Sequence, residues 1–525
     1  MMGREKSDGR VVAQGRVTPA PTAPKRGAKA TTVSKQAIQP NLFDGGAAVD
    51  ALPANLESMR WPAMTMEEVS SDANLRTAFQ QVVANKGAPG PDRQTVEQVC
   101  QHAETILPAL RRSLLAGRYS PGDIRRVWIP KANGGQRGLG IPNVVDRIVQ
   151  QAVYQVLSPN YEPRFHPSSH GFRPGRSCHT AIAEAQSHLQ HGYEWVVDLD
   201  LSRFFDTVHH DRLMSRLAQR IKDAPLLRLI RQMLTAQVIL PDGMVQATTE
   251  GTPQGGPLSP LLSNIVLDEL DWELEQRGHR FVRYADDCNI YVRSEQAGLR
   301  VMTATTRFIE RRLRLTVNQS KSSVARPETR HFLGFRLWRK DPGHPVQVLL
   351  SQRSKDRAAA KIRELTPRNW GAPLSAAIAR INVYLTGWLG YFRICSDNAE
   401  NRRQLSNWDA HLRRRLRAIK LRQFKRKPTI VQRLVAMGAP EPAARAAVYG
   451  QARSIWRLSH TYAVEQGAMP PQWFAAQGLI SIAQRHRECW RPVTASAKKP
   501  KKLKAKAHAK QGNLLPPPGV PKSRM

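Results

Sequence analysis

The segment FVRYADDCNIYV, residues 281–292, sets two adjacent aspartates between two apolar runs, and it constrains the fold more than any other part of the chain. Each run is short and rich in the β-branched and aromatic residues that are typical of strands. The pattern predicts a hairpin whose tip presents Asp286 and Asp287. Because an aspartate in a tight turn commonly bonds nearby backbone amides, this segment on its own favours a structural turn.

A second acidic segment, EWVVDLDLSRFFD at residues 194–206, begins as an alternating strand. The alternation predicts one face with Trp195, Val197, Leu199 and Leu201, and an opposite face with Val196, Asp198 and Asp200. Carboxylates gathered from both segments would repel one another at low dielectric unless cations neutralised them. Mg²⁺ prefers such hard oxygen ligands. Together the segments predict a site for two Mg²⁺ ions that transfers phosphoryl groups.

The charge balance predicts a polyanionic partner. Lys and Arg number 80 against 42 Asp and Glu, a formal net charge of +38, which favours nucleic acid over the alternative of a merely basic surface. Five widely spaced cysteines without a Cys-x-x-Cys pair indicate a reducing compartment, the cytoplasm. Without an apolar run of about 18 residues, membrane insertion is disfavoured. At 525 residues, two or three domains are expected.

Seven blocks in order resemble the group II intron-encoded reverse transcriptases, of the bacterial type that lacks a nuclease domain with paired cysteines and histidines. They span roughly residues 75–340 and read NKGAPGPD (85–92), WIPKANGGQRGLGIPNVVDRIVQQA (128–152), SSHGFRPGRSCHTAI (168–182), DLDLSRFFD (198–206), GTPQGGPLSPLLSNIVLDELD (251–271), NQSKS (318–322) and HFLGF (331–335). The resemblance also rests on the tetrapeptide Tyr284-Ala285-Asp286-Asp287.

The resemblance implies an RNA-directed DNA polymerase that uses two Mg²⁺ ions, deoxynucleoside triphosphates, an intron RNA template and a DNA primer. Asp200, Asp286 and Asp287 match the catalytic metal-binding aspartates. Lys131 and Arg137 match residues that clamp the triphosphate, Phe205 the aromatic residue that excludes a 2′-hydroxyl, and Gln254 a loop beside the nascent base pair. Asn318 and Lys321 match a block whose role could equally be structural.

The implied architecture is an α+β right-hand polymerase with fingers, an antiparallel-sheet palm and a helical thumb. Composition and resemblance together divide the chain into a disordered basic arm (1–48), fingers and palm (49–345), a thumb or maturase domain called domain X (355–430), a helical segment that could contact DNA or RNA (431–495), and a disordered lysine-rich tail (496–525). Near the N-terminus of the second part, Leu75, Phe79, Val82 and Val83 predict a helix that ends at a Gly/Pro loop.

The region after residue 355 is helical and basic. Ile381, Leu385, Trp388, Leu389 and Phe392 recur at helical spacing, which indicates core positions. The following helix carries basic residues all around it, and we expect RNA phosphates to bind there. The candidate RNA-binding residues are Arg413, Arg414, Arg415, Arg417, Lys420 and Lys425. Trp456, Trp473 and Trp490 could stack on bases, although core positions are favoured.

Two other functions remain open at this stage. A maturase could stabilise intron RNA for splicing without polymerising DNA, and a reverse transcriptase could have been recruited to phage defence. The complete set of aspartates together with Phe205, Lys131 and Arg137 argues against a polymerase that has lost its activity. The maturase-like region argues, more weakly, against recruitment to defence.

Overall fold

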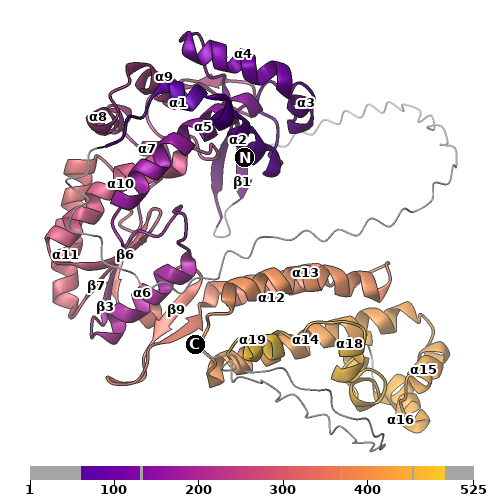
Figure 1. Cartoon of the computed structure of the whole chain (residues 1–525). Helices are drawn as coiled ribbons and strands as arrows, with labels where there is room; N and C mark the ends of the chain where they lie inside the picture. The colour runs from indigo at the N-terminus through magenta and orange to yellow at the C-terminus, as the bar shows by residue number, and fades with distance from the viewer. Residues whose placement is uncertain (1–60, 131–133, 368, 452–453, 491–525) are drawn as a thin grey trace, which may run out of the picture. The chain divides into compact units, whose positions relative to one another are not determined.

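The computed structural model describes residues 61–130, 134–367, 369–451 and 454–490. Lys131 and the predicted arms at residues 1–48 and 496–525 lie outside these ranges. Within them, no helix is both long enough and apolar enough to cross a membrane. Helices and sheets are mixed along the described chain, which confirms the predicted α+β class (Figure 1).

The first described part is helical because its apolar residues recur at helical spacing. In α2 (Asp72–Ala84), Leu75 and Val82 are buried, and Ser71 caps the first turn by accepting a hydrogen bond from the Asn74 N–H. This confirms the helix predicted there. Its neighbours are α1 (Met66–Ser70), α3 (Val96–Gln101), α4 (Ala103–Leu115) and α5 (Val144–Tyr161), which continues into η1 (Glu162–Arg164).

A four-stranded antiparallel sheet in the order β6-β7-β3-β8 carries the acidic segments. Its pairing of Tyr284 with Asp287 leaves only Ala285 and Asp286 in the turn between β6 and β7, so the predicted hairpin is confirmed. The strands are β3 (Trp195–Leu199), β6 (Arg280–Tyr284), β7 (Asp287–Val292) and β8 (Ser323–Ala325).

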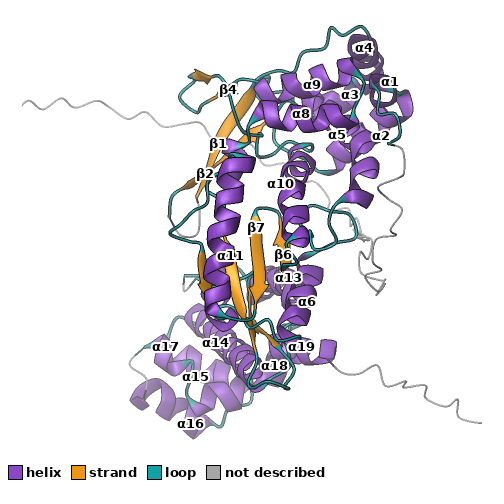
Figure 2. Cartoon of the chain, turned by 90° about the vertical axis from the view of Figure 1, so that its left-hand side faces the viewer, coloured by secondary structure: helices purple, strands orange, loops and turns teal. Residues whose placement is uncertain are grey.

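The two faces of this sheet pack against different cores. Val197 and Ile290 belong to the larger core, to which α10 (Ser259–Gln276) and α11 (Glu295–Phe308) also contribute. Figure 2 shows these two helices beside the sheet. Val196 and Tyr291 belong to the second core, together with α6 (Cys178–Gln190). Since side chains alternate along a strand, Asp198 projects from the second face, as the sequence predicts.

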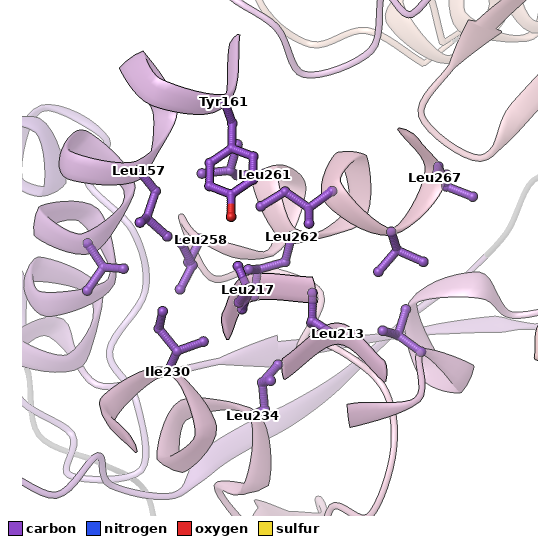
Figure 3. Close-up of a cluster of buried hydrophobic side chains, with 14 of the residues drawn as sticks. Leu157, Tyr161, Leu213, Leu217, Ile230, Leu234, Leu258, Leu261, Leu262 and Leu267 are labelled. Atoms are coloured by element: carbon purple, nitrogen blue, oxygen red, sulfur yellow. The ribbon is translucent and has the colours of Figure 1, made fainter. Parts of the chain in front are cut away.

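The larger core fixes the position of the sheet against a helical layer. Leu157, Leu217, Ile230 and Leu262 from four different helices meet there (Figure 3). The helices of this layer include α7 (Phe204–Thr207), α8 (His210–Arg220) and α9 (Ala224–Thr235). A second sheet has the strand order β2-β1-β4-β5. Its strands are β1 (Ile124–Pro130), β2 (Gln136–Ile141), β4 (Val238–Ile239) and β5 (Val245–Gln246).

The second core holds the helices after residue 350. Ile381, Leu385 and Leu389 are buried, and Trp388 and Phe392 are partly buried, which confirms their predicted core positions. After α11 the remaining elements are η2 (Ile309–Leu313), η3 (Pro327–Thr329), β9 (Phe335–Trp338), β10 (Gln347–Leu350), α12 (Gln352–Leu365), α13 (Leu374–Phe392), α14 (Ala399–Gln423), α15 (Lys427–Ala436), α16 (Glu441–Arg445), η4 (Ala446–Gln451), α17 (Ile455–Leu458), η5 (Ala463–Ala468), α18 (Pro471–Ala476) and α19 (Ile482–Trp490).

Candidate active site

Asp286 lies in the turn between β6 and β7, and Asp287, which the sequence placed at the tip, is the first residue of β7. Ala285 has a φ of +58°, a left-handed conformation that costs a non-glycine residue roughly 1–2 kcal/mol. Gly171 lies directly against this turn, because a Cβ added to it would stand 2.1 Å from the Ala285 backbone nitrogen. Only a glycine lets the loop at residue 171 approach the turn so closely.

Asp200 follows the end of β3, where the last paired residues are Leu199 and Cys288, the neighbour of Asp287. Its backbone is held by the block at residues 318–322. The Asp200 N–H donates to Ser322 Oγ (3.0 Å), and the Asp200 carbonyl accepts from the Asn318 N–H (2.8 Å). Lys321 Nζ lies 3.5 Å from Asp200 Oδ1. The segment at residues 318–322, for which the sequence left the role open, therefore holds the first catalytic candidate, Asp200, in place.

The ionisation of Asp286 and Asp287 is affected by the carboxylates around them. Burial raises the pKa of Asp287 to about 7, and the negative charges of Asp198, Asp286 and Asp200 contribute to that rise. Burial also raises the pKa of Asp286, with Asp200 adding to the rise and Arg137 opposing it. A cluster of carboxylates that disfavour one another's charge has the electrostatics of a cation site.

Asp198, whose charge also acts on Asp287, has an arginine as its ion-pair partner. Arg330 Nε donates to Asp198 Oδ2 (2.9 Å), and a second nitrogen of the same guanidinium contacts the same oxygen. Burial nevertheless raises the pKa of Asp198, and the arginine opposes that rise. Since Arg330 also donates to the Lys321 carbonyl (3.1 Å), it stabilises the segment at residues 318–322, which holds Asp200.

Among the described residues, no group of three or more His, Cys, Asp or Glu side chains forms a ready-made metal site. Divalent ions in phosphoryl transfer are commonly held by one or two carboxylates together with substrate phosphates, so a complete protein cage is not needed. Asp200, Asp286 and Asp287 supply hard oxygen donors whose mutual repulsion a divalent ion would relieve. The donor set fits such an ion.

The loop GTPQGG joins the candidate nucleotide-binding residues. The Thr252 N–H donates to the Phe205 carbonyl (2.6 Å), and the Gln254 carbonyl accepts from the Gly140 N–H (2.7 Å) in the strand that carries Arg137. Gly255, at a φ of +130°, lies so close to that strand that a Cβ would stand 2.4 Å from the Gly140 oxygen. Backbone hydrogen bonds thus connect the loop that carries Gln254 both to Phe205 and to the strand that carries Arg137.

Sequence reasoning missed Arg283, which lies three residues before Asp286. It is 1% exposed and forms an ion pair with Asp271, which is fully buried. Its guanidinium also donates to the Ala285 carbonyl in the turn (2.9 Å). A charged residue in the otherwise apolar run FVRYA was the available signal, because an arginine is almost never fully buried unless it is paired.

Two family models match the chain. The model for reverse transcriptase (RNA-dependent DNA polymerase) matches residues 129–337, and the model for the group II intron maturase-specific domain matches residues 355–435. Protein YkfC of Escherichia coli (strain K12) is 35% identical over 350 residues, which are 59% of this chain and 89% of YkfC. The chain belongs to the group II intron-encoded reverse transcriptases.

Other similarities cover less of their chains. Group II intron-encoded protein LtrA of Lactococcus lactis subsp. cremoris is 38% identical over 208 residues, 39% of this reverse transcriptase and 34% of LtrA. A solved partial Cas6-RT-Cas1--Cas2 complex aligns at 25% identity and a TM-score of 0.31, covering 47% of this chain and 42% of the other. The family identifies an RNA-directed DNA polymerase with a maturase region, and its members bind nucleic acid and use divalent metal ions.

The maturase region of this reverse transcriptase corrects one predicted RNA contact. Arg417 is 1% exposed, lies 3.2 Å from Glu465 through Nη1 and donates to the Met469 carbonyl (3.1 Å). The prediction that Arg417 binds RNA is therefore wrong. The basic residues surround α14 because some of them pack inward against neighbouring helices, which the sequence pattern does not show.

The other candidate arginines of α14 are half-buried, and two of them, Arg414 and Arg415, have protein contacts. Arg415 donates to the Thr366 carbonyl (2.6 Å), and the Arg414 guanidinium lies 4.2 Å from the centre of the Trp456 ring. Arg413 and Lys420 are half-buried as well. Lys425, which follows the end of α14, is exposed, and so is Arg426 beside it. RNA binding by Arg413, Arg414, Arg415, Lys420 and Lys425 stays a prediction.

The three tryptophans after residue 450 do not share one role. Trp473 packs against the second core, as expected for a core position. Trp456 is half-buried beneath Arg414. Trp490 is 44% exposed, and its indole N–H donates to the Arg393 carbonyl (3.1 Å). The core interpretation therefore holds for Trp473 only.

Proposed function

We propose that Asp200, Asp286 and Asp287 hold two Mg²⁺ ions at which a DNA primer is extended on an intron RNA template, an activity that we place in the cytoplasm. What supports this proposal is that the negative charge of Asp200 adds to the rise in the pKa of both Asp286 and Asp287, so the charges of the three aspartates act within one site. When bound, the two ions would lower the pKa of the primer 3′-hydroxyl and stabilise the leaving pyrophosphate.

The remaining residues of the site bind and orient. Arg137 acts electrostatically on Asp286, so its cation is placed where it can stabilise the negative charge of a nucleoside triphosphate. Lys131 would act with it. Phe205 and Gln254, joined by the loop GTPQGG, would contact the sugar and the nascent base pair, and Phe205 would exclude a 2′-hydroxyl. No covalent intermediate is required.

Residues 49–345 would then form fingers and palm, and residues 355–430 the thumb. Asp198, paired with Arg330, keeps a structural role in this arrangement.

The test is primer extension on an RNA template with Asp286→Asn and Asp200→Asn variants. Each should lose extension by several orders of magnitude while keeping its affinity for the template–primer, because a neutral amide removes an ion ligand without changing the shape of the turn. Asp242→Asn, in the exposed turn between β4 and β5, is the matched control and should extend normally. Wild-type extension by the Asp286 variant would exclude the assigned site.

A second candidate function, intron RNA binding in splicing, is favoured by basic residues at the end of α14 and in the turn that follows it. Arg422, Lys425 and Arg426 reach solvent within the region that matches the maturase-specific domain. Changing the three to glutamine should flatten the dependence of log K for intron RNA on log salt by roughly 0.7–0.9 for each phosphate that the variant no longer neutralises. Arg417→Met should leave the slope unchanged, since that side chain is buried. An unchanged slope in the triple variant would remove this end of α14 from the interface.

A further inference from the structure

All the N–H groups of the Arg283 guanidinium donate hydrogen bonds within the protein. Nε and Nη2 donate to the two oxygens of Asp271 (2.7 and 2.5 Å), Nη1 donates to Asn264 Oδ1 (3.0 Å) and the Ala285 carbonyl (2.9 Å), and Nη2 also donates to Ser169 Oγ (2.7 Å). An arginine has five N–H donors, so these five bonds satisfy all of them. A lysine, with three donors on one atom, cannot replace this pattern.

The acceptors come from separate elements around the turn. Asp271 and Asn264 belong to α10, and both are fully buried. Ser169 belongs to the loop before α6, which also pairs with β6 through its backbone: the Arg283 N–H donates to the Ser168 carbonyl (2.9 Å), and the His170 N–H donates to the Arg283 carbonyl (2.8 Å). Arg283 thereby connects β6, the strand that leads into the turn, to α10 and to the loop before α6.

The same two elements hold the turn itself. Asn264 Nδ2 donates to the Gly171 carbonyl (2.9 Å), and Gly171 lies against the Ala285 nitrogen. On the other side of that residue, the Ala285 carbonyl accepts from Arg283. Ala285 keeps its left-handed φ of +58° between these two contacts, and its conformation sets the direction in which Asp286 and Asp287 leave the turn.

We propose that Arg283 is a positioning residue for the divalent ions: it fixes Ala285 so that the carboxylates of Asp286 and Asp287 converge with that of Asp200. This inference rests on the proposed function of the three aspartates. Residues that orient metal ligands from behind commonly change metal affinity or activity 10–100-fold when they are replaced. A purely structural ion pair would instead be replaceable by apolar side chains of similar size, often without loss of stability.

Metal affinity and stability, measured on the same variant, distinguish a positioning residue from a purely structural ion pair. The double variant Arg283→Met/Asp271→Leu removes both buried charges together, so its thermal midpoint should fall less than that of Arg283→Met alone, which would leave Asp271 buried without its partner. Its Mn²⁺ affinity, measured by electron paramagnetic resonance on a complex with RNA template and dideoxy-terminated DNA primer, should fall about 10–100-fold. Extension of an ordinary primer should fall by a similar factor, with template–primer affinity unchanged.

Two further variants keep the test decisive. Ser169→Ala removes a single acceptor from the network and should weaken Mn²⁺ binding several-fold even if the double variant fails to fold. Arg417→Met, which removes a buried arginine in the maturase region, should lower stability without changing Mn²⁺ affinity.

Wild-type Mn²⁺ affinity in both the folded double variant and Ser169→Ala would overturn the inference, and wild-type affinity in Ser169→Ala alone would overturn it if the double variant does not fold. The proposed polymerase function fails separately, when the wild-type protein binds Mn²⁺ but does not extend a primer on RNA.

Discussion

Replacing Gly171 by alanine should displace the catalytic turn while leaving the rest of the protein folded. The new Cβ would stand 2.1 Å from the Ala285 nitrogen and 2.9 Å from both the Ala285 Cα and the Tyr284 carbonyl carbon, whereas ordinary contacts begin near 3.4 Å. The difference between 3.4 and 2.1 Å requires the two backbones to separate by about 1.3 Å. Both obstacles are backbone, so no side chain can rotate away to make room.

The displacement acts on the two aspartates that follow Ala285. A misplacement of about 1 Å at a reacting centre can cost on the order of 100-fold in rate. That factor corresponds to about 2.7 kcal/mol in activation free energy. Overpacking a well-packed site costs about 1–3 kcal/mol of folding stability, which a large protein can tolerate. We therefore expect a large loss of activity and a modest fall in thermal midpoint.

Single-turnover extension on an RNA template and thermal unfolding are the two measurements. Gly371→Ala is the matched control, since a Cβ at that exposed residue meets nothing within 4 Å and its φ is not in the left-handed range. It should leave both quantities unchanged. If Gly171→Ala extends primers at the wild-type rate with wild-type stability, the close approach of the loop to the turn does not position the aspartates.

Two other substitutions test the site and its support. Phe205→Ala should increase incorporation of ribonucleotides relative to deoxynucleotides in a competition assay, and undiminished discrimination would remove Phe205 from the sugar site. Burial raises the pKa of Asp268 to about 7, with Asp271 adding to the rise, so the folded state holds this proton more tightly than the unfolded state. The stabilising contribution of that proton is complete below the unfolded pKa of 3.8 and is lost as pH rises through 7. Asp268→Asn should therefore gain stability over the wild type by roughly 2 kcal/mol or more between pH 4 and pH 8 in denaturant titrations, and a gap that does not widen with pH would refute this.

Local sequence was sufficient for the elements of the site. Period-two alternation and the pair of aspartates between apolar runs predicted β3, the β6–β7 hairpin and its acidic tip, because strand faces and tight turns depend on neighbouring residues. The helical spacing of Ile381, Leu385 and Leu389 likewise predicted a buried helix face. The ordered motif blocks added the family and the candidate role of each aspartate.

Charge composition, in contrast, did not distinguish surface from interior. Arg417 belongs to a run of basic residues that is typical of an RNA-binding surface, yet it is buried beside Glu465. Arg283 likewise interrupts an apolar strand without any nearby sign of its partner, since Asp271 comes from α10 and Ser169 from another loop. Both partnerships join residues from separate elements, which no local pattern encodes.

The sequence by itself determined the acidic strand, the hairpin and the buried helix faces, where the aspartates stand on them, and that a polyanion is the expected partner. Only the tertiary structure decided which charges meet: Arg330 with Asp198, Lys321 with Asp200, and Arg283 with the turn before Asp286. The physical reason is that secondary structure follows from interactions between near neighbours in the chain. Pairing and burial of a charge depend instead on which distant segments the folded core brings within a few ångströms of it.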